Sequence, residues 1–144
     1  MAARASAVVL DTNVFSADLL RSTRPLVEVY RPLLSGRRFL ISFQTLAEVQ
    51  FGLRRRDWGP VRIARAQAHI ERAQVVWPGP ALLGTYVDLR VTCERTGHAL
   101  AQPDHDADRW IAATAIHLGV PLVSHDGIFR DAPGLAFETA LGGP

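Results

Sequence analysis

The sequence contains no lysine, because all 16 basic residues among its 144 are arginines. This absence excludes P-loop NTPases, protein kinases and enzymes that form a Schiff base through a lysine amine. Arginine, in contrast, makes planar, bidentate contacts to phosphate. Coding bias produces the same composition, so the arginines alone do not identify a nucleic-acid-binding protein.

Cysteine and long apolar runs are also scarce. The one cysteine, Cys93, excludes an internal disulfide and a zinc site built from several thiolates, which suits a reducing compartment, and we expect this side chain to be buried. No apolar run reaches the roughly 20 residues that cross a bilayer, and the N-terminus lacks the features of a signal peptide. We therefore expect a cytoplasmic protein without a membrane role.

The rest of the composition is typical of one globular domain, with 48% hydrophobic and 21% charged residues. No repeat or linker divides the chain, so we predict a single domain over residues 1–144. Short apolar runs alternate with helical patterns, which predicts an α/β fold with a central, mostly parallel β-sheet flanked by helices. The predicted strands are 7–10, 39–41, 74–77, 121–123 and 136–138. Helices are predicted from 14, over 25–34, from Ser42 to the basic run 54–56, and over 61–72, 80–95 and 106–118.

Four acidic residues stand out by their positions. Asp11 directly follows the first strand, and Asp126 follows the fourth, so both are expected at the carboxyl edge of the sheet, where ligands of such sheets bind. Glu48 lies on its helix beside Gln44, Thr45 and Phe51 rather than on an obviously solvated face. Asp108 begins the apolar stripe formed by residues 111, 112, 115 and 116 of its helix.

Each acid also has a purely structural interpretation. Asp11 suits a helix cap, Glu48 a surface helix and Asp126 a turn. Asp108 suits the first turn of a helix, where an acid favours the helix dipole, with Asp104 or Asp106 as the cap. Their joint placement favours a functional cluster. Several buried carboxylates repel one another, and a divalent cation relieves that repulsion. Hard oxygen ligands favour Mg²⁺ or Mn²⁺, which activate water for phosphodiester hydrolysis.

Four segments around these acids form a recognisable pattern. The most specific is Asp108-Arg109-Trp110-Ile111-Ala112-Ala113-Thr114-Ala115. The other three are Val8-Val9-Leu10-Asp11-Thr12-Asn13, Thr45-Leu46-Ala47-Glu48-Val49 and Ser124-His125-Asp126-Gly127-Ile128-Phe129. Over nearly its whole length, the chain therefore resembles the PIN-domain ribonucleases, and most closely the VapC toxins of bacterial VapBC toxin–antitoxin pairs.

The resemblance implies a site in which Asp11, Glu48, Asp108 and Asp126 bind Mg²⁺ or Mn²⁺ and act in catalysis. It also implies endonucleolytic cleavage of RNA that leaves 5′-phosphate and 3′-hydroxyl ends. Thr12 is expected to orient the site through its hydroxyl, and Asn13 and Ser124 are expected to support the metal ligands. His125 departs from the usual pattern, and we interpret it as an exposed turn residue.

Ten acids and 16 arginines remain outside this site, which predicts a basic rim around it. The candidates for phosphate contact are Arg54, Arg55, Arg56, Arg109 and Arg130, although helix-end and solvent roles explain the first three equally well. The resemblance further implies a homodimer that a small VapB-like antitoxin neutralises.

Other functions fit the sequence less well or remain as alternatives. A haloacid-dehalogenase phosphatase requires a second Asp where this chain has Asn13, and both it and a response-regulator receiver require a lysine. A degenerate PIN fold that serves as an RNA-binding or assembly module would be expected to have lost some of the acids. A nuclease acting on single-stranded DNA stays open, because no residue that reads a 2′-hydroxyl can be named.

Overall fold

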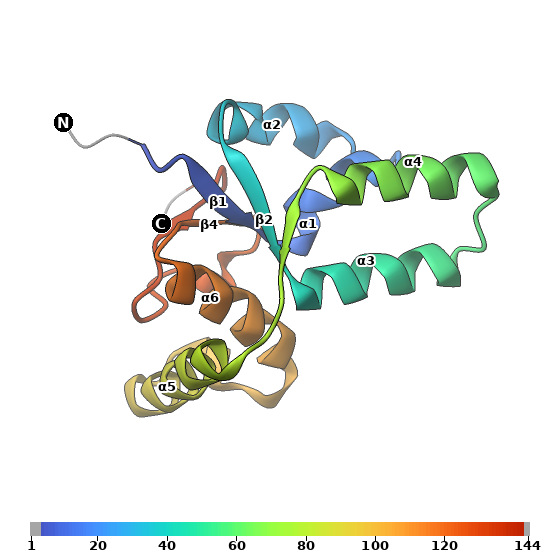
Figure 1. The fold of residues 1–144 in the computed structure, drawn as a ribbon. Coiled ribbons are helices and arrows are strands. Elements are labelled where there is room, and N and C mark those ends of the chain that lie inside the picture. The colour runs from blue at the N-terminus through green and yellow to red at the C-terminus, as the bar shows by residue number, and fades with distance from the viewer. Residues whose placement is uncertain (1–3, 143–144) are drawn as a thin grey trace.

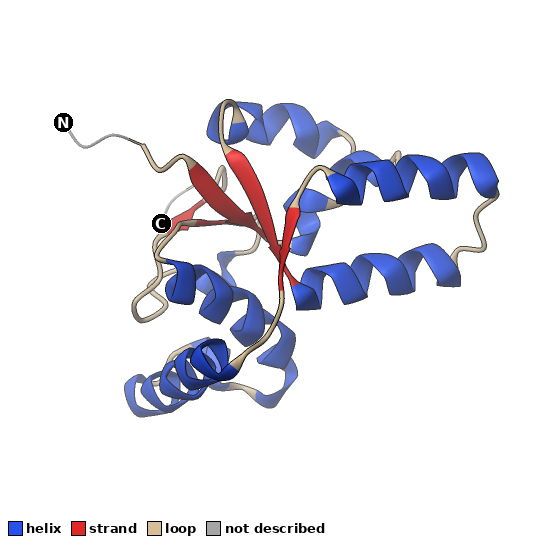
Figure 2. Cartoon of the chain, viewed as in Figure 1, coloured by secondary structure: helices blue, strands red, loops and turns tan. Residues whose placement is uncertain are grey.

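Five short strands form the centre of the molecule in the computed structural model, which describes residues 4–142 (Figures 1 and 2). They are β1 (Ala7–Leu10), β2 (Arg38–Ser42), β3 (Gln74–Val76), β4 (Leu122–Val123) and β5 (Phe137–Glu138). The strand order is β3-β2-β1-β4-β5, and every neighbouring pair is parallel. The predicted α/β fold is confirmed, and the sheet is parallel throughout rather than mostly parallel.

Helices connect the strands, as the alternating pattern predicted. The α-helices are α1 (Thr12–Phe15), α2 (Pro25–Leu34), α3 (Phe43–Arg55), α4 (Pro60–Glu71), α5 (Pro80–Thr96) and α6 (Asp106–Leu118). Short 3₁₀ helices lie at η1 (Ala17–Leu19), η2 (Ala99–Ala101), η3 (Pro103–His105) and η4 (Gly127–Phe129). No helix within residues 4–142 is long and apolar enough to cross a membrane.

Local chemistry explains where several helices begin and end. The Ser42 hydroxyl accepts a hydrogen bond from the Gln44 backbone N–H at 3.1 Å, which caps α3 as predicted. Gly97 and Gly119 end α5 and α6 with φ of 76° and 67°, the left-handed conformation that glycine adopts without a steric cost. Strand β3 ends one residue earlier than predicted, so Trp77 lies just beyond it.

The alternation of side chains along β1 divides the core into two layers. Ala7 and Val9 pack with α5 and α6 on one face of the sheet, and buried Cys93 belongs to this layer as expected. Val8 and Leu10 pack with α1, α2 and α3 on the other face. Burial of β1 on both faces explains its uninterrupted apolar sequence.

The strand order positions the candidate site. Chain connections run from β1 outward to β2 and β3, and then return to place β4 on the opposite side of β1. Ligands of open α/β sheets bind where the order reverses in this way, beyond the carboxyl ends of the strands. From that edge, α3 extends away from the sheet and α4 returns beside it as a helical hairpin (Figure 1).

Candidate functional site

The carboxyl ends of β1 and β4 meet at the predicted edge. The Asp11 backbone N–H donates to the Val123 carbonyl at 3.0 Å, so Asp11 and Ser124 follow two hydrogen-bonded strands at the same level. Strand β2 ends beside them at Ser42, where α3 begins. The parallel sheet therefore brings residues that are more than one hundred positions apart into one location.

Asp11 is the most buried of the four acids, with 5% of its surface exposed. Its Oδ2 accepts a hydrogen bond from the Ser124 hydroxyl at 2.6 Å, and its Oδ1 accepts one from the Thr12 backbone N–H at 2.8 Å. The second bond caps the short helix α1, so the capping interpretation of Asp11 holds alongside the functional one. Both bonds fix the orientation of the carboxylate.

Glu48 reaches the site from α3 and is half-buried. Its Oε2 accepts a hydrogen bond from the Thr12 hydroxyl, which also lies 3.0 Å from the hydroxyl of buried Thr45. Its Oε1 accepts a longer bond of 3.4 Å from the Gln44 side-chain amide. Phe51, which we placed on the same helix face, is instead 64% exposed, because α3 leaves the sheet beyond Glu48.

Asp108 lies in the first turn of α6 and is half-buried, while Ile111, Ala112 and Ala115 behind it are fully buried. Its Oδ2 is 2.8 Å from the His105 Nδ1. The alternative caps do not close this helix, since its N-cap is His105 and no side chain there bonds to the backbone. An acid therefore heads an apolar stripe, as the sequence predicted.

Asp126 lies at the rim rather than in the interior. It is exposed, and its Oδ1 accepts a 2.9 Å hydrogen bond from the Ile128 backbone N–H, which caps η4. Its own N–H donates to the Ser124 hydroxyl at 3.0 Å, and that hydroxyl donates to Asp11. Ser124, which is fully buried, thus links the two acids at the ends of neighbouring strands.

Asn13 and His125 brace the same loop. The Asn13 side-chain Oδ1 accepts a hydrogen bond from the His125 backbone N–H at 3.2 Å. The His125 ring is half-buried, with Nδ1 2.8 Å from the Tyr30 hydroxyl, so our interpretation of an exposed turn residue is wrong. Tyr30 is fully buried, and its hydroxyl also donates to the Ser124 carbonyl at 3.1 Å.

Burial and the charges of two neighbouring carboxylates both act on the ionisation of Asp11. Burial raises the pKa of Asp11, its bonds to Ser124 and Thr12 lower it, and the negative charges of Asp108 and Glu48 raise it, so that the pKa lies at about 6. Asp11 is therefore a buried acid whose ionised form lacks a compensating cation among its protein neighbours.

The donors suit a divalent metal by their chemistry, since they are carboxylate oxygens, which Mg²⁺ and Mn²⁺ prefer. Within residues 4–142, however, no three His, Cys, Asp or Glu side chains are close enough together to hold one ion. Glu48 and Asp108 are instead held by Thr12 and His105. The acids share one region, and each has its own hydrogen-bond partner.

Comparison with known proteins identifies the fold. The PIN domain profile matches residues 8–135, which is most of the chain and includes all four acids. The chain belongs to the PIN domain family. No curated protein matches its sequence.

Several solved structures share the fold of this chain, among them a member of the VapBC family of toxin–antitoxin systems. FitAcB from Neisseria gonorrhoeae has a TM-score of 0.76 and 22% identity, over 92% of this chain and 97% of that one. DNA-bound VapBC from Salmonella typhimurium has a TM-score of 0.75 and 23% identity, over 94% and 98%. VapBC-5 from Mycobacterium tuberculosis has a TM-score of 0.64 and 25% identity, over 93% and 97%.

The arginines that we considered for phosphate contact occupy different environments in this PIN domain. Arg54, Arg55 and Arg56 are exposed at the end of α3, roughly 9–12 Å along the helix beyond Glu48. Arg130 is half-buried and donates to the Gly142 carbonyl at 3.0 Å. Arg109 is 1% exposed, so its guanidinium does not reach a phosphate, and we withdraw it from the candidates.

Sequence reasoning missed His105. The spacing of His105 and Asp108 could have indicated their contact. The 3₁₀ helix η3 leads directly into α6, and residues three positions apart in a helix are neighbours. It also missed the role of Tyr30, whose contacts to residues 124 and 125 cross nearly one hundred positions and leave no local pattern.

The raised pKa of Asp11 predicts how the free energy of unfolding of the metal-free protein depends on pH. An aspartate pKa of 3.8 in the unfolded chain and about 6 in the folded one means that the folded state binds more protons between these values. The free energy of unfolding therefore falls as pH rises from about 4 to 6, by at most about 3 kcal/mol, and stays low above pH 6. Asp11→Asn removes this contribution.

We expect Asp11→Asn to gain stability relative to the original protein as pH rises from 4 to 8. Urea unfolding of both proteins in chelator across this range measures the difference. Parallel stability curves, whatever the constant offset between them, would contradict the raised pKa, and that offset would report only the altered hydrogen bonds to Ser124 and Thr12.

Proposed function

We propose that this PIN domain is a metal-dependent endoribonuclease, the toxin of a VapBC-like toxin–antitoxin pair. Its reaction is the hydrolysis of RNA phosphodiester bonds to 5′-phosphate and 3′-hydroxyl ends. The observation that carries the proposal is Asp11, a buried carboxylate at the carboxyl edge of the sheet whose pKa is raised by burial and by the charges of Asp108 and Glu48. The family match and the shared fold support a nuclease.

Asp11, Glu48, Asp108 and Asp126 are the residues proposed to hold Mg²⁺ or Mn²⁺ and to act in catalysis. When bound, the ion supplies an activated water and stabilises the developing charge on the phosphate. The chain supplies orientation, since Ser124 and Thr12 fix the Asp11 carboxylate and the Thr12 hydroxyl fixes Glu48.

Asn13 has a different part in this proposal, because it supports the loop that carries two other site residues. Its side chain accepts from the His125 N–H, between Ser124 and Asp126. Loss of that bond would loosen both neighbours together. Thr12, Asn13 and Ser124 therefore act through the acids rather than on RNA.

The proposed RNA contacts are electrostatic at the rim of the site. Arg54, Arg55 and Arg56 form an exposed basic end on the helix that carries Glu48, and Arg130 lies just beyond η4, which Asp126 caps. Arginine binds phosphate through its planar fork, and such contacts make affinity dependent on salt.

The proposed partners are a VapB-like antitoxin and a second copy of this chain, in the cytoplasm. The antitoxin is supported by the solved structures with the same fold, which include VapBC and FitAcB complexes. The homodimer follows only from resemblance to the VapC toxins. Size measurement in solution, with and without the antitoxin, tests both.

Cleavage of total RNA by the purified chain tests the proposed reaction, with Mg²⁺, with Mn²⁺ and with chelator. Mapping of the new 5′ ends should show discrete, metal-dependent cuts that bear 5′-phosphates. Single-stranded DNA is assayed under the same conditions. Cleavage of DNA but not of RNA would show that DNA is the substrate. Binding of RNA without any cleavage by folded protein would favour a binding or assembly module instead.

A further inference from the structure

Trp77 is an exposed aromatic residue beside the candidate site. It immediately follows β3, at the same carboxyl edge from which Asp11 and Ser124 emerge, and 65% of its surface is exposed. Single exposed apolar residues are ordinary on protein surfaces, so exposure alone has no functional meaning. The position of this one is what matters.

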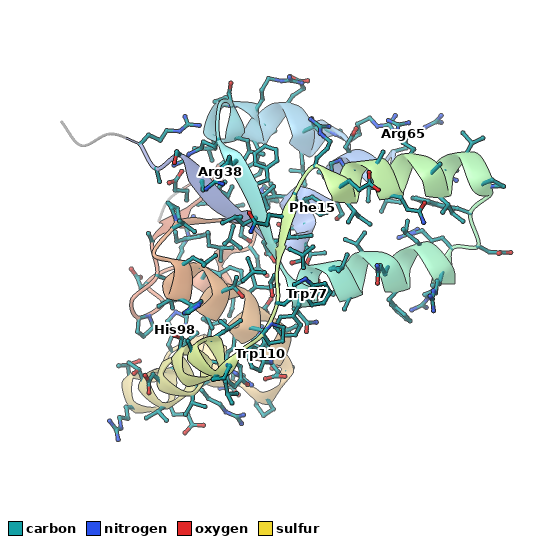
Figure 3. All side chains as sticks on the ribbon, viewed as in Figure 1. Phe15, Arg38, Arg65, Trp77, His98 and Trp110 are labelled. Atoms are coloured by element: carbon teal, nitrogen blue, oxygen red, sulfur yellow. The ribbon has the colours of Figure 1, made fainter. Side chains whose placement is uncertain are left out.

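Two aromatic residues that neighbour the acids in sequence, Phe43 and Trp110, pack near the edge of the sheet where Trp77 lies. The β2–β3 register pairs Ser42 with Val76, so Trp77 is level with Phe43 at the start of α3. Phe43 and Trp110 pack edge-to-face with ring centroids 5.4 Å apart, and both pack against the same core cluster as Val76. Trp110 lies two residues after Asp108, and Figure 3 labels Trp77 just beyond β3 and Trp110 on α6.

Phe43, Trp110 and Tyr86 form a tightly packed aromatic group. Trp110 is half-buried and stacks on Tyr86 with ring centroids 4.0 Å apart and planes 15° from parallel. Tyr86 is 7% exposed. Trp77 is thus an exposed aromatic residue at the sheet edge where α3 begins with Phe43, a member of this packed group.

The charges along α3 indicate what could lie on this surface. Phe43 begins the helix near Trp77, Glu48 follows roughly 8 Å along the axis, and the arginines 54–56 end it. A single strand of RNA laid along this direction would meet an aromatic face, the acids and then cations in that order. Proteins that bind single strands combine such aromatic faces with basic contacts to the backbone.

We propose that Trp77 is a substrate-binding residue that stacks on an unpaired base of RNA next to the scissile phosphate. The inference rests on the proposed ribonuclease function, which it deepens by naming a base-binding position. Stacking tolerates any base, because each has a π-face, and it does not depend on salt as phosphate contacts do.

Binding of short, fluorescent oligoadenosine and oligouridine to the full chain in chelator tests the proposal. Trp77→Leu keeps an apolar side chain without a π-face and should weaken binding roughly 5- to 150-fold, the range for loss of one stacked base. Trp77→Tyr should restore most of the affinity. The slope of affinity against salt should stay unchanged in both variants, because no phosphate contact is lost.

Trp58 provides a matched control. It lies between α3 and α4 at the outer end of the helical hairpin, where the Arg62 guanidinium is 4.2 Å from its ring centroid. Trp58→Leu removes the same π-face at the end of α3 that carries the proposed phosphate contacts, away from the acids, and should weaken RNA binding much less than Trp77→Leu. An RNA with an abasic position opposite Trp77 should bind the original protein and Trp77→Leu equally, which isolates the stacking contact.

Three results would overturn the inference. Equal RNA affinity of Trp77→Leu and the original protein would show that Trp77 does not stack on RNA. The proposed nuclease function would be unaffected by that result. A loss of affinity that Trp77→Tyr does not restore would show that packing is responsible. A changed oligomeric mass with unchanged RNA affinity would make Trp77 part of a protein interface. Absence of any RNA binding or cleavage by the original protein is a different result, which refutes the proposed function itself.

Discussion

Replacement of Asp108 or Asp11 by Asn is expected to lower metal-dependent RNA cleavage by at least about 100-fold. Loss of a side chain that merely orients a metal ligand costs about 10- to 100-fold, so loss of a ligand's charge should cost more. Each substitution keeps the shape of the side chain and leaves the apolar stripe of α6 and the strand β1 in place. The measurement is the initial cleavage rate at several Mn²⁺ concentrations.

Asp104 supplies the control for that experiment. It lies in η3, four residues before Asp108, and it is exposed. Asp104→Asn makes the same chemical change outside the cluster and should cleave at the original rate. Full activity in Asp11→Asn or Asp108→Asn would contradict the assigned site, whereas loss of activity in all three variants would indicate an effect of net charge.

Replacement of Arg109 by Ala is expected to reduce the free energy of unfolding by about 3 kcal/mol or more. The guanidinium is almost fully buried, and its Nη1 donates to the Leu100 and Gln102 carbonyls at 2.6 and 2.8 Å. Its Nη2 forms an ion pair with the Asp106 Oδ1 at 3.2 Å. Removal takes this donor from both carbonyls, of which Gln102 keeps a bond from the His105 N–H, and leaves a cavity beside the core.

The effect of Arg109 should extend to the site. The two carbonyls belong to η2 and the residue before η3, and this segment leads directly to His105 and Asp108. We therefore expect Arg109→Ala to lose activity together with stability. Arg109→Lys should lose less activity and less stability than Arg109→Ala, because one ammonium on a flexible chain replaces the rigid guanidinium only in part.

Urea unfolding measures these changes, with Arg90→Ala as the control. Arg90 is half-exposed and lies 3.8 Å from Glu94 on the same helix, so its loss should change stability by less than about 0.5 kcal/mol. A stable Arg109→Ala variant with weakened RNA binding would instead restore the phosphate contact that we first predicted from the sequence.

Several elements could be predicted because their determinants are local. The run Ala7–Leu10 is apolar without interruption, so it required a strand buried on both faces. Ser42 and Gly97 mark a helix start and a helix end through their own backbone chemistry. The placement of Asp11 at the carboxyl edge followed from its position directly after a strand.

Other features depend on how distant elements pack. Arg109 is buried because the Leu100 carbonyl of η2 and the Asp106 side chain face its guanidinium. The position of Arg109 next to Asp108 in the sequence did not reveal these contacts. The exposure of Phe51 required knowledge that α3 leaves the sheet. The Tyr30 contacts to residues 124 and 125 join the α2 layer to the loop after β4.

The sequence by itself therefore determined the α/β class, the order of strands and helices along the chain, and the positions of four acids, two just after parallel strands and two on helices. These properties follow from periodicity, capping and turn chemistry within a few residues. Only the tertiary structure decided that the sheet is parallel throughout, that β4 lies beside β1, and that Arg109 is internal while Trp77 is external. Those outcomes depend on which faces bury each other, and contacts between residues about one hundred positions apart leave no trace in any short stretch of sequence.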